Sequence, residues 1–301
     1  MPSLVGSEMC IRDRYEELFL LHKMTMFEMD LWMSMAYFIE QQVDYCIIEA
    51  GMGGRLDATT ALDYKACLIT NVGLDHTEYL GDTFEQIAYE KSGVFKPNVP
   101  ALTTEDKPEC QKVMELVADY MKTPLCFIDC QETDVLRWNG MTFHLNPPLY
   151  QAKNLSLALE TLNVLGIWLE ENEIQQVIDH FQWAGRYMVL RKDPLVLLDG
   201  AHNVHGITAL IQSLKDFTGK IYFSVLKEKD APHMIELLQS ISKDITLVEI
   251  SSARLYPLEE LGYPIITVDE LISRLLDTKE DSLLCGSLYY VGEVLEKWGN
   301  V

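Results

Sequence analysis

Short apolar runs alternate with amphipathic segments along most of this 301-residue chain. The runs at 45–48 and 66–69 are rich in large aliphatic residues, and each is soon followed by polar residues. This pattern predicts two buried parallel strands whose carboxyl ends face a ligand crevice. Helices are predicted at 83–93 and at 25–41, where Thr25 and Glu28 have the spacing of a capping box.

Short apolar runs and amphipathic segments continue to alternate up to residue 184. After a strand at 99–102 and a helix at 107–121, three short strand-like runs suggest an antiparallel accessory sheet. These runs occupy residues 125–128, 135–138 and 141–145. Helices at 150–165 and 174–181 then lead into a hinge at 182–186.

A second α/β alternation begins at residue 185 and predicts a mostly parallel sheet flanked by helices. Its strands are predicted at 195–198, 221–225, 246–250 and 282–285, and its helices at 205–216, 231–240, 269–276 and 288–298. We therefore expect an α/β protein with an unmatched leader (1–14), a central domain (15–184) and a smaller C-terminal domain (185–301).

The composition of the chain restricts the classes of binding partner that we expect, and it says little about the fold. The formal net charge of −22 gives a surface that repels nucleic-acid phosphates and anionic lipid. No apolar run approaches the length of a membrane span, and residues 1–14 lack the apolar segment of a secretory signal. The seven cysteines are scattered and odd in number, which favours a reducing compartment. We expect a cytoplasmic monomer with small-molecule partners, and neither nucleic acid nor membrane.

Glu49 and His76 follow the first two predicted strands. A carboxylate oxygen and a neutral imidazole nitrogen can both bind Mg²⁺ in a phosphate-handling site. In the competing interpretation, His76 closes a loop and Glu49 pairs with Arg55. The glycines at 51, 53 and 54 can bring backbone N–H groups close to an anion or a flat ligand. They do not form a dinucleotide fingerprint, because Leu56 occupies the third glycine position.

Two further positions have both functional and structural interpretations. Lys91 has the residue type of an ordinary solvated lysine in an i, i+4 pair. At the other site, a buried strand ends in Asp199, turns at Gly200 and starts a helix near Asn203, a good place for phosphate and ribose contacts. Arg186 could bind a phosphate with two hydrogen bonds. The alternative is a capped turn in which Asp199 accepts bonds from the backbone.

Several of these motifs, in this order, resemble the bacterial folylpolyglutamate synthase/dihydrofolate synthase family of the Mur ligase superfamily. They are IEAGMGGRLDAT (48–59), LDH (74–76), LGDT (80–83), EKSG (90–93), DGAHN (199–203) and GSLY (286–289). The resemblance covers residue 24 to the C-terminus. It implies a Mur-ligase-like fold with an incomplete N-terminal parallel-sheet ATPase domain and a smaller C-terminal, Rossmann-like, glutamate-ligase domain.

The resemblance also implies an activity. ATP would phosphorylate the carboxylate of a folate or dihydropteroate, and the amine of L-glutamate would attack the acyl phosphate. Mg²⁺, with a monovalent cation as a further candidate, would offset the phosphate charge.

Site residues carry over position by position. Glu49 and His76 match the metal ligands, and Lys91 matches a lysine that becomes N-carboxylysine, so Lys91 and His76 are the candidate catalytic residues. The candidate ATP contacts are Asn154, Arg186, Asp199 and His202. The candidate pterin surface consists of Thr25, Met26, Phe27, Glu28, Leu56, Asp57 and Ala58.

One departure from the family pattern bears on activity. Gly-x-x-x-x-Gly-Lys-Ser/Thr occurs nowhere in these 301 residues, whereas family members carry an N-terminal phosphate loop. We therefore expect an N-terminally truncated synthase with little or no turnover. The alternatives are another Mur-type amino-acid ligase, separable by binding a UDP-sugar rather than a pteroate, and a non-catalytic folate- or nucleotide-binding remnant. A dehydrogenase is disfavoured by the glycine spacing.

Overall fold

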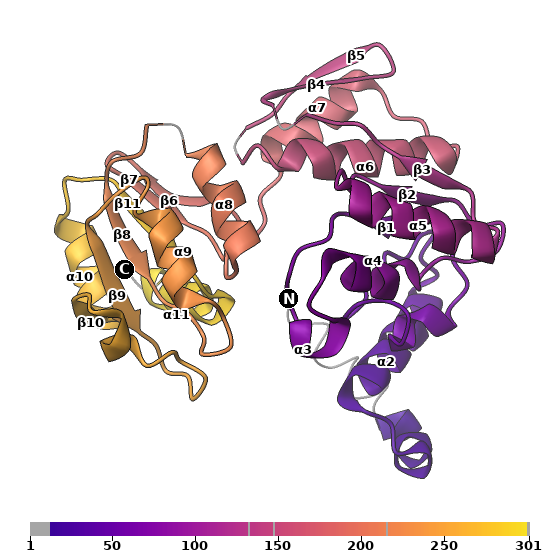
Figure 1. The fold of residues 1–301 in the computed structure, drawn as a ribbon, viewed down its shortest axis with the longest axis horizontal. Coiled ribbons are helices and arrows are strands. Elements are labelled where there is room, and N and C mark those ends of the chain that lie inside the picture. The colour runs from indigo at the N-terminus through magenta and orange to yellow at the C-terminus, as the bar shows by residue number, and fades with distance from the viewer. Residues whose placement is uncertain (1–12, 132, 147, 215, 300–301) are drawn as a thin grey trace. The chain divides into compact units, whose positions relative to one another are not determined.

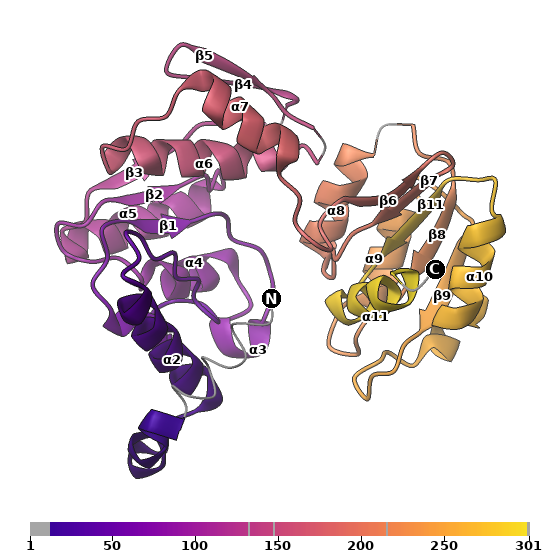
Figure 2. The same ribbon diagram turned by 180° about the vertical axis from the view of Figure 1, so that it is seen from behind.

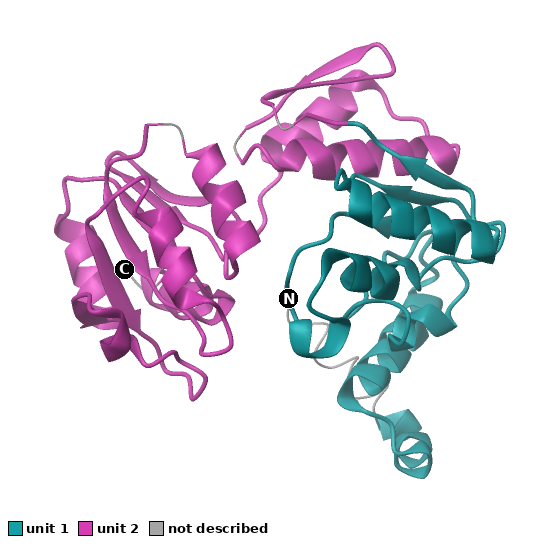
Figure 3. Ribbon diagram, viewed as in Figure 1, with its two compact units in different colours: residues 1–129 teal, residues 130–301 magenta. Residues whose placement is uncertain are grey.

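The computed structural model describes residues 13–131, 133–146, 148–214 and 216–299. The chain forms two compact units, residues 1–129 and residues 130–301 (Figure 3). The predicted boundary between residues 184 and 185 lies inside the second unit and stays a prediction.

The first unit is built around a parallel sheet of three short strands in the order β1-β2-β3. The strands are β1 (Cys67–Ile69), β2 (Ala101–Thr103) and β3 (Leu125–Phe127). Helices α4 (Phe84–Ser92) and α5 (Pro108–Met121) pack their apolar faces on one side of it (Figure 1). Residues 13–22, α2 (Met26–Gln41), η1 (Ala58–Ala61) and α3 (Thr77–Leu80) complete the unit.

The predicted capping box of α2 is confirmed. Thr25 accepts a hydrogen bond from the Glu28 backbone N–H, and the Glu28 side chain accepts one from the Thr25 backbone N–H. The predicted strand at 45–48 is wrong, because this segment has no regular structure and Ile47 is 94% exposed. An apolar run becomes a strand only when another strand pairs with its backbone groups, and no described strand pairs with this one.

A helical hairpin with a two-stranded flap opens the second unit. Strands β4 (Val135–Trp138) and β5 (Met141–His144) pair antiparallel and pack against α6 (Gln151–Val164) and α7 (Glu171–His180). The expected accessory sheet is therefore right for these two strands. It is wrong for 125–128, since β3 pairs in parallel with β2.

A six-stranded sheet forms the rest of the second unit, in the order β10-β9-β8-β11-β7-β6. All neighbours are parallel except the edge strand β6, which runs antiparallel to β7. The strands are β6 (Met188–Lys192), β7 (Leu195–Leu198), β8 (Lys220–Phe223), β9 (Ile245–Glu249), β10 (Ile265–Thr267) and β11 (Ser282–Cys285). β6 and β10 are absent from the sequence prediction.

Helices cover both faces of this sheet and bury two apolar clusters. α8 (Val204–Ser213) and α9 (Ala231–Leu238) lie on one face, and α10 (Val268–Asp277) and α11 (Leu288–Trp298) on the other (Figures 1 and 2). Because β11 returns between β7 and β8, the strand order reverses there, and ligands of such sheets bind outside the carboxyl ends at that point. η2 (Leu258–Leu261) precedes β10.

In the part of the chain that the structure describes, no helix combines the length and the apolar character that a membrane span requires.

Candidate active site

The glycine loop after Glu49 is pressed against the C-terminal end of α4. The Arg55 backbone N–H donates to the Glu90 carbonyl at 2.8 Å, and the Arg55 guanidinium makes a forked ion pair with the Glu90 carboxylate, at 3.0 Å from Nε and 2.8 Å from Nη2. A Cβ at Gly93 would lie 2.2 Å from Arg55 Cα, so only glycine permits this approach. Arg55 therefore pairs with Glu90, not with Glu49.

Asp57 fixes the shape of the same loop. Its carboxylate accepts hydrogen bonds from the Met52 N–H at 3.0 Å, from the Thr59 N–H at 3.0 Å and from the Thr59 hydroxyl at 2.6 Å. Burial alone would raise the pKa of Asp57, but the hydrogen bonds from Thr59, Met52 and Gly51 outweigh it and lower that pKa. The predicted substrate residue thus has its acceptor atoms engaged within the loop.

The other predicted pterin-surface residues gather from two segments. A Cβ at Gly51 would lie 2.8 Å from the Phe27 ring, so the start of α2 packs against the loop. Met26 and Leu56 present their side chains to solvent, 75% and 81% exposed. Thr25 and Glu28 are engaged in the capping box, and Ala58 begins η1 and is half-buried.

Lys91 lies close to two carboxylates in the second half of α4. Burial lowers the pKa of Lys91, and the negative charges of Asp75 and Glu49 oppose that shift. Glu49, Asp75 and Lys91 thus come together from three separate segments, which spacing alone left undecided. Asp75 has no predicted role from the sequence, although its position beside His76 is a signal of one.

His76 follows Asp75 directly and is exposed. Its backbone is left-handed (φ 51°, ψ 38°), and its carbonyl accepts hydrogen bonds from the backbone N–H groups of Tyr79 and Leu80, the last two residues of α3. A non-glycine residue in this conformation persists where its surroundings hold it there.

The donor set suits a hard divalent cation that keeps part of its water shell. Among the described residues, no three His, Cys, Asp or Glu side chains form a ready-made metal cage. Mg²⁺ in phosphate-handling sites is usually held by one or two carboxylates together with the substrate phosphates. Glu49 and Asp75 would supply two such carboxylates, and His76 follows Asp75 directly along the chain.

In the second unit, Asp199 stands at the carboxyl end of β7. Its carboxylate accepts hydrogen bonds from the Tyr187 N–H and the Ala201 N–H, both at 2.7 Å. Burial raises the pKa of Asp199, while these two bonds and the charges of Arg186 and His202 oppose the shift. The capped-turn interpretation of Asp199 therefore describes its bonds correctly, and the predicted neighbours Arg186 and His202 are also beside it.

Arg186 reaches this site across a glycine. A Cβ at Gly200 would lie 2.7 Å from Arg186 Nη1, so the guanidinium packs directly against the backbone of the turn. His202 Nδ1 lies 2.8 Å from the Gly200 carbonyl oxygen. The turn leads into α8, where the Asn203 side chain caps the helix by accepting from the Gly206 N–H at 2.8 Å.

Tyr150, which is not among the predicted site residues, belongs to the same neighbourhood. Burial raises its pKa and Asp199 raises it further, while Arg186 lowers it. It stands at the N-terminus of α6. Just before this helix, the Leu149 backbone N–H donates a hydrogen bond to Ser213 Oγ of α8 at 3.0 Å. Asn154 lies one turn further along α6; it is exposed, and its Nδ2 donates to Gln151 Oε1 at 3.1 Å.

Known proteins match this chain over most of its length. The Mur ligase middle domain model matches residues 15–145. The dihydrofolate synthase/folylpolyglutamate synthase of Bacillus subtilis is 28% identical over 91% of this chain and 72% of its own length. The counterpart from Buchnera aphidicola of Schizaphis graminum is 32% identical over 72% of this chain, which spans only 54% of it.

Solved structures agree with these matches. The Escherichia coli FolC structure in complex with ADP has a TM-score of 0.81 and 28% identity, covering 92% of this chain and 72% of that one. The chain is thus similar to folylpolyglutamate synthases/dihydrofolate synthases over most of its length. The synthase from Yersinia pestis, complexed with AMPPNP and manganese, has a TM-score of 0.80 and 25% identity, covering 92% and 72% of the two chains. The expected Mur-ligase-like α/β fold is therefore confirmed, and these synthases are ATP-dependent ligases.

Proposed function

We propose that this chain serves ATP-dependent ligation of L-glutamate to a folate or dihydropteroate carboxylate through an acyl phosphate. The observation that carries this proposal is the meeting of Lys91 with Glu49 and Asp75 beside the glycine loop. A free carboxylate is a poor acyl donor, so the reaction needs phosphate as a leaving group and a site that tolerates its charge.

In this proposal, Glu49 and His76 hold a magnesium ion, with Asp75 nearby. The cation offsets the charge on the transferred phosphate when it is bound. The lowered pKa of Lys91 increases the fraction of its amine that is neutral. Only the neutral amine can add to carbon dioxide, and the resulting carbamate would place another anionic oxygen ligand beside the two carboxylates. Lys91 would thus serve the metal site as N-carboxylysine.

The nucleotide is assigned to the carboxyl edge of the six-stranded sheet. Arg186 offers a planar, forked donor for a phosphate, and the N-terminus of α8 offers backbone N–H groups and a favourable dipole. Asp199 and His202 supply acceptors beside them, and Asn154 is available on α6. The residues 185–301 are proposed as the glutamate-ligase domain.

The pterin is assigned to the apolar surface of Phe27, Met26 and Leu56. A flat heterocycle gains most from exposed aromatic and aliphatic surface that does not have to rearrange on binding. The polar neighbours Thr25, Glu28 and Asp57 would act by holding this surface in place. The chain is further proposed to act as a cytoplasmic monomer on small molecules alone, because its charge of −22 disfavours phosphate-rich polymers.

This proposal can be tested by measuring ligand binding at equilibrium and enzymatic turnover on the same preparation of the chain. We expect the purified chain to bind Mn²⁺ and a dihydropteroate, measured by electron paramagnetic resonance and by calorimetry. Glu49→Gln should weaken Mn²⁺ binding about tenfold or more, because one carboxylate ligand is lost. The matched control is Glu109→Gln, an exposed carboxylate on α5.

Ligation is then assayed with ATP, L-glutamate and the pteroate. The expectation of little turnover by this chain remains a prediction. ADP release that depends on ATP, L-glutamate and the pteroate would overturn that expectation and would support the proposed function. Binding of a UDP-sugar in place of the pteroate would assign the chain to another Mur-type ligase. Failure to bind either Mn²⁺ or pteroate would contradict the proposed function.

A further inference from the structure

A buried carboxylate lies just beyond the carboxyl end of β2, outside the residues assigned so far. The side chain of Glu105 has no exposed area. Its Oε1 accepts hydrogen bonds from the Asp106 N–H at 3.1 Å, the Lys107 N–H at 2.8 Å and Lys107 Nζ at 3.2 Å. Its Oε2 accepts from the backbone N–H of Val72, which follows β1. Glu105 thus joins the turn after β2 to the segment after β1.

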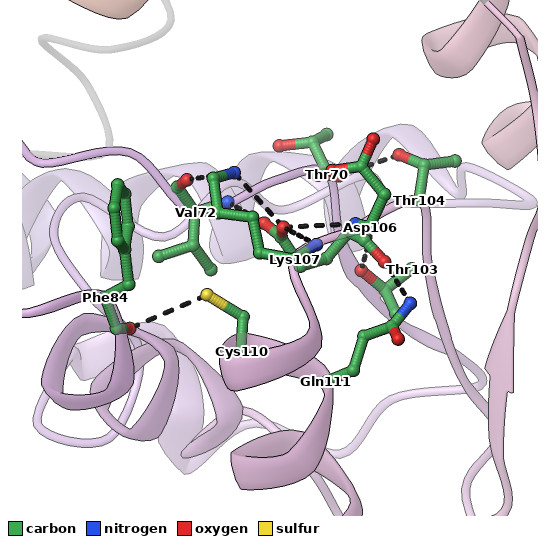
Figure 4. Close-up of polar contacts among 10 residues, drawn as sticks. Thr70, Val72, Phe84, Thr103, Thr104, Asp106, Lys107, Cys110 and Gln111 are labelled. Carbon is green, nitrogen blue, oxygen red and sulfur yellow. Dashed lines mark hydrogen bonds and ion pairs between the residues drawn. The ribbon is translucent and has the colours of Figure 1, made fainter.

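Two more hydrogen bonds join the same segments (Figure 4). Lys107 Nζ donates to the Val72 carbonyl at 3.0 Å, and the Thr104 hydroxyl donates to the Thr70 carbonyl at 2.7 Å. The segment is therefore held at the Thr70 carbonyl and at both backbone polar groups of Val72, a residue with no exposed area. Gln111 Nε2 fixes the other side of the turn by donating to the Glu105 carbonyl at 2.8 Å.

The segment held in this way leads directly to the candidate metal site. Asp75, whose charge acts on Lys91, follows Val72 by three residues, and His76 follows it by four. α3 restrains the left-handed backbone of His76 on its C-terminal side. On the N-terminal side the His76 N–H donates to Asp75 Oδ1 at 2.9 Å and the Asp75 N–H donates to the Gly73 carbonyl at 3.0 Å, and both bonds lie within the loop itself. A fully satisfied buried charge network is rigid, because any displacement leaves a buried charge without its partners.

We propose that Glu105 and Lys107 are positioning residues that fix the loop 70–76 and thereby place Asp75 and His76 at the metal site. This inference rests on the proposed function for its purpose. The restraint itself, and its effect on His76, can be measured without metal or substrate.

Glu105→Gln removes the key contact selectively. Oε1 accepts from three donors and Oε2 from one, so the amide oxygen should stay with the three, and the new NH₂ group should face the Val72 N–H, donor against donor. Lys107→Met is the second variant, because it keeps an unbranched aliphatic side chain and removes the ammonium, whose Nζ lies 5.4 Å from the centroid of the Phe84 ring. Glu109→Gln is the control, with the same charge change on an exposed side chain of α5.

The first readout is hydrogen exchange of the peptide containing Val72 in the full chain. Both test variants should exchange there about tenfold faster than the parent, as loss of a buried charge-assisted hydrogen bond implies, while the control stays unchanged. The second readout is the imidazole ¹H–¹³C signal of His76, assigned by its absence in His76→Gln. It should shift in both test variants and not in the control.

Faster exchange with an unmoved His76 signal would overturn the proposal, because Glu105 would then have a purely structural role. Unchanged exchange in both variants would overturn it as well. If Glu105→Gln does not fold, Lys107→Met decides by the same two readouts. Mn²⁺ added to the parent tests the proposed function separately, since broadening of the His76 signal reports metal binding and its failure leaves the metal-free readouts valid.

Discussion

At the scale of single residues, the candidate site uses several polar side chains to hold the backbone rather than to face a ligand. Asp57, Glu28 and Glu105 all direct their carboxylate oxygens at backbone N–H groups. Each such bond satisfies a donor that a loop would otherwise leave to water, and charged acceptors make these bonds stronger than neutral ones.

Replacing Asp57 by Asn tests whether this side chain stabilises the loop backbone. Asn keeps one oxygen for Thr59 but turns an NH₂ group toward the Met52 N–H, so we expect the free energy of unfolding at pH 7 to fall by about 1 kcal/mol. The exposed Asp63→Asn is the control. Urea unfolding followed by circular dichroism measures both, and equal effects of the two substitutions would contradict the role given to Asp57.

The effect of pH on this variant has a defined sign. The pKa of Asp57 is lowered in the folded chain, so the stabilisation by its ionised form is complete above the unfolded pKa and is lost as pH falls through the folded one. The difference between the parent and Asp57→Asn should therefore shrink below about pH 4, the unfolded value for aspartate.

At the scale of elements, the candidate site depends on how closely the glycine loop approaches α4. Gly93 has an ordinary right-handed helical backbone (φ −62°, ψ −10°), so alanine there would meet no conformational penalty. Its Cβ would instead lie 2.2 Å from Arg55 Cα, which forces the two backbones apart.

Gly93→Ala should therefore destabilise the chain by about 1–3 kcal/mol, the usual cost of overpacking. Gly292→Ala is a control of opposite sign: a Cβ within α11 would meet nothing within 4 Å, so the helix should gain about 0.5–1 kcal/mol. Thermal unfolding monitored by calorimetry measures both. A neutral Gly93→Ala would show that the loop does not need this contact.

The elements that could be predicted from sequence are those whose own residues carry the signal. α2 has its capping box, β7 is a continuous apolar run, and β8, β9 and β11 are mostly apolar, with buried neighbours on both faces. The segment 45–48 has the same apolar signal but no pairing partner among the strands that the structure describes. β10 has only three residues, and β6 is an edge strand with a register shift after Val189. Neither strand therefore has an apolar pattern that distinguishes it from the neighbouring sequence.

The candidate site shows the same limit. Asp199 could be predicted from the end of a strong strand, whereas Tyr150 enters its neighbourhood through the packing of α6 near α8. Glu105 looks like one acidic residue among the 46 acidic residues of this chain, and only its burial distinguishes it. Sequence motifs thus identify site residues at the ends of helices and strands. The residues that hold these site residues in position are identified only by their tertiary contacts.

At the scale of the whole molecule, the two compact units divide the proposed chemistry. The cation and pterin residues belong to residues 1–129, and the proposed nucleotide residues belong to residues 130–301. A ligand that binds only the folded form stabilises it by mass action, so a nucleotide should act first on the unit that contains its site.

AMPPNP with Mg²⁺ should therefore stabilise the unit that contains Asp199, by about 2.7 kcal/mol at one hundred times its dissociation constant. Hydrogen exchange read separately for the two units measures the effect, which is expected as slower exchange around 199–206. Arg186→Ala should remove most of it, because a forked phosphate donor is lost. Arg137→Ala, an exposed arginine on β4 of the same unit, removes an equal charge and should leave the stabilisation intact. Equal losses in the two variants would mean that the nucleotide responds only to net charge, and protection confined to residues 1–129 would move the nucleotide site to the other unit.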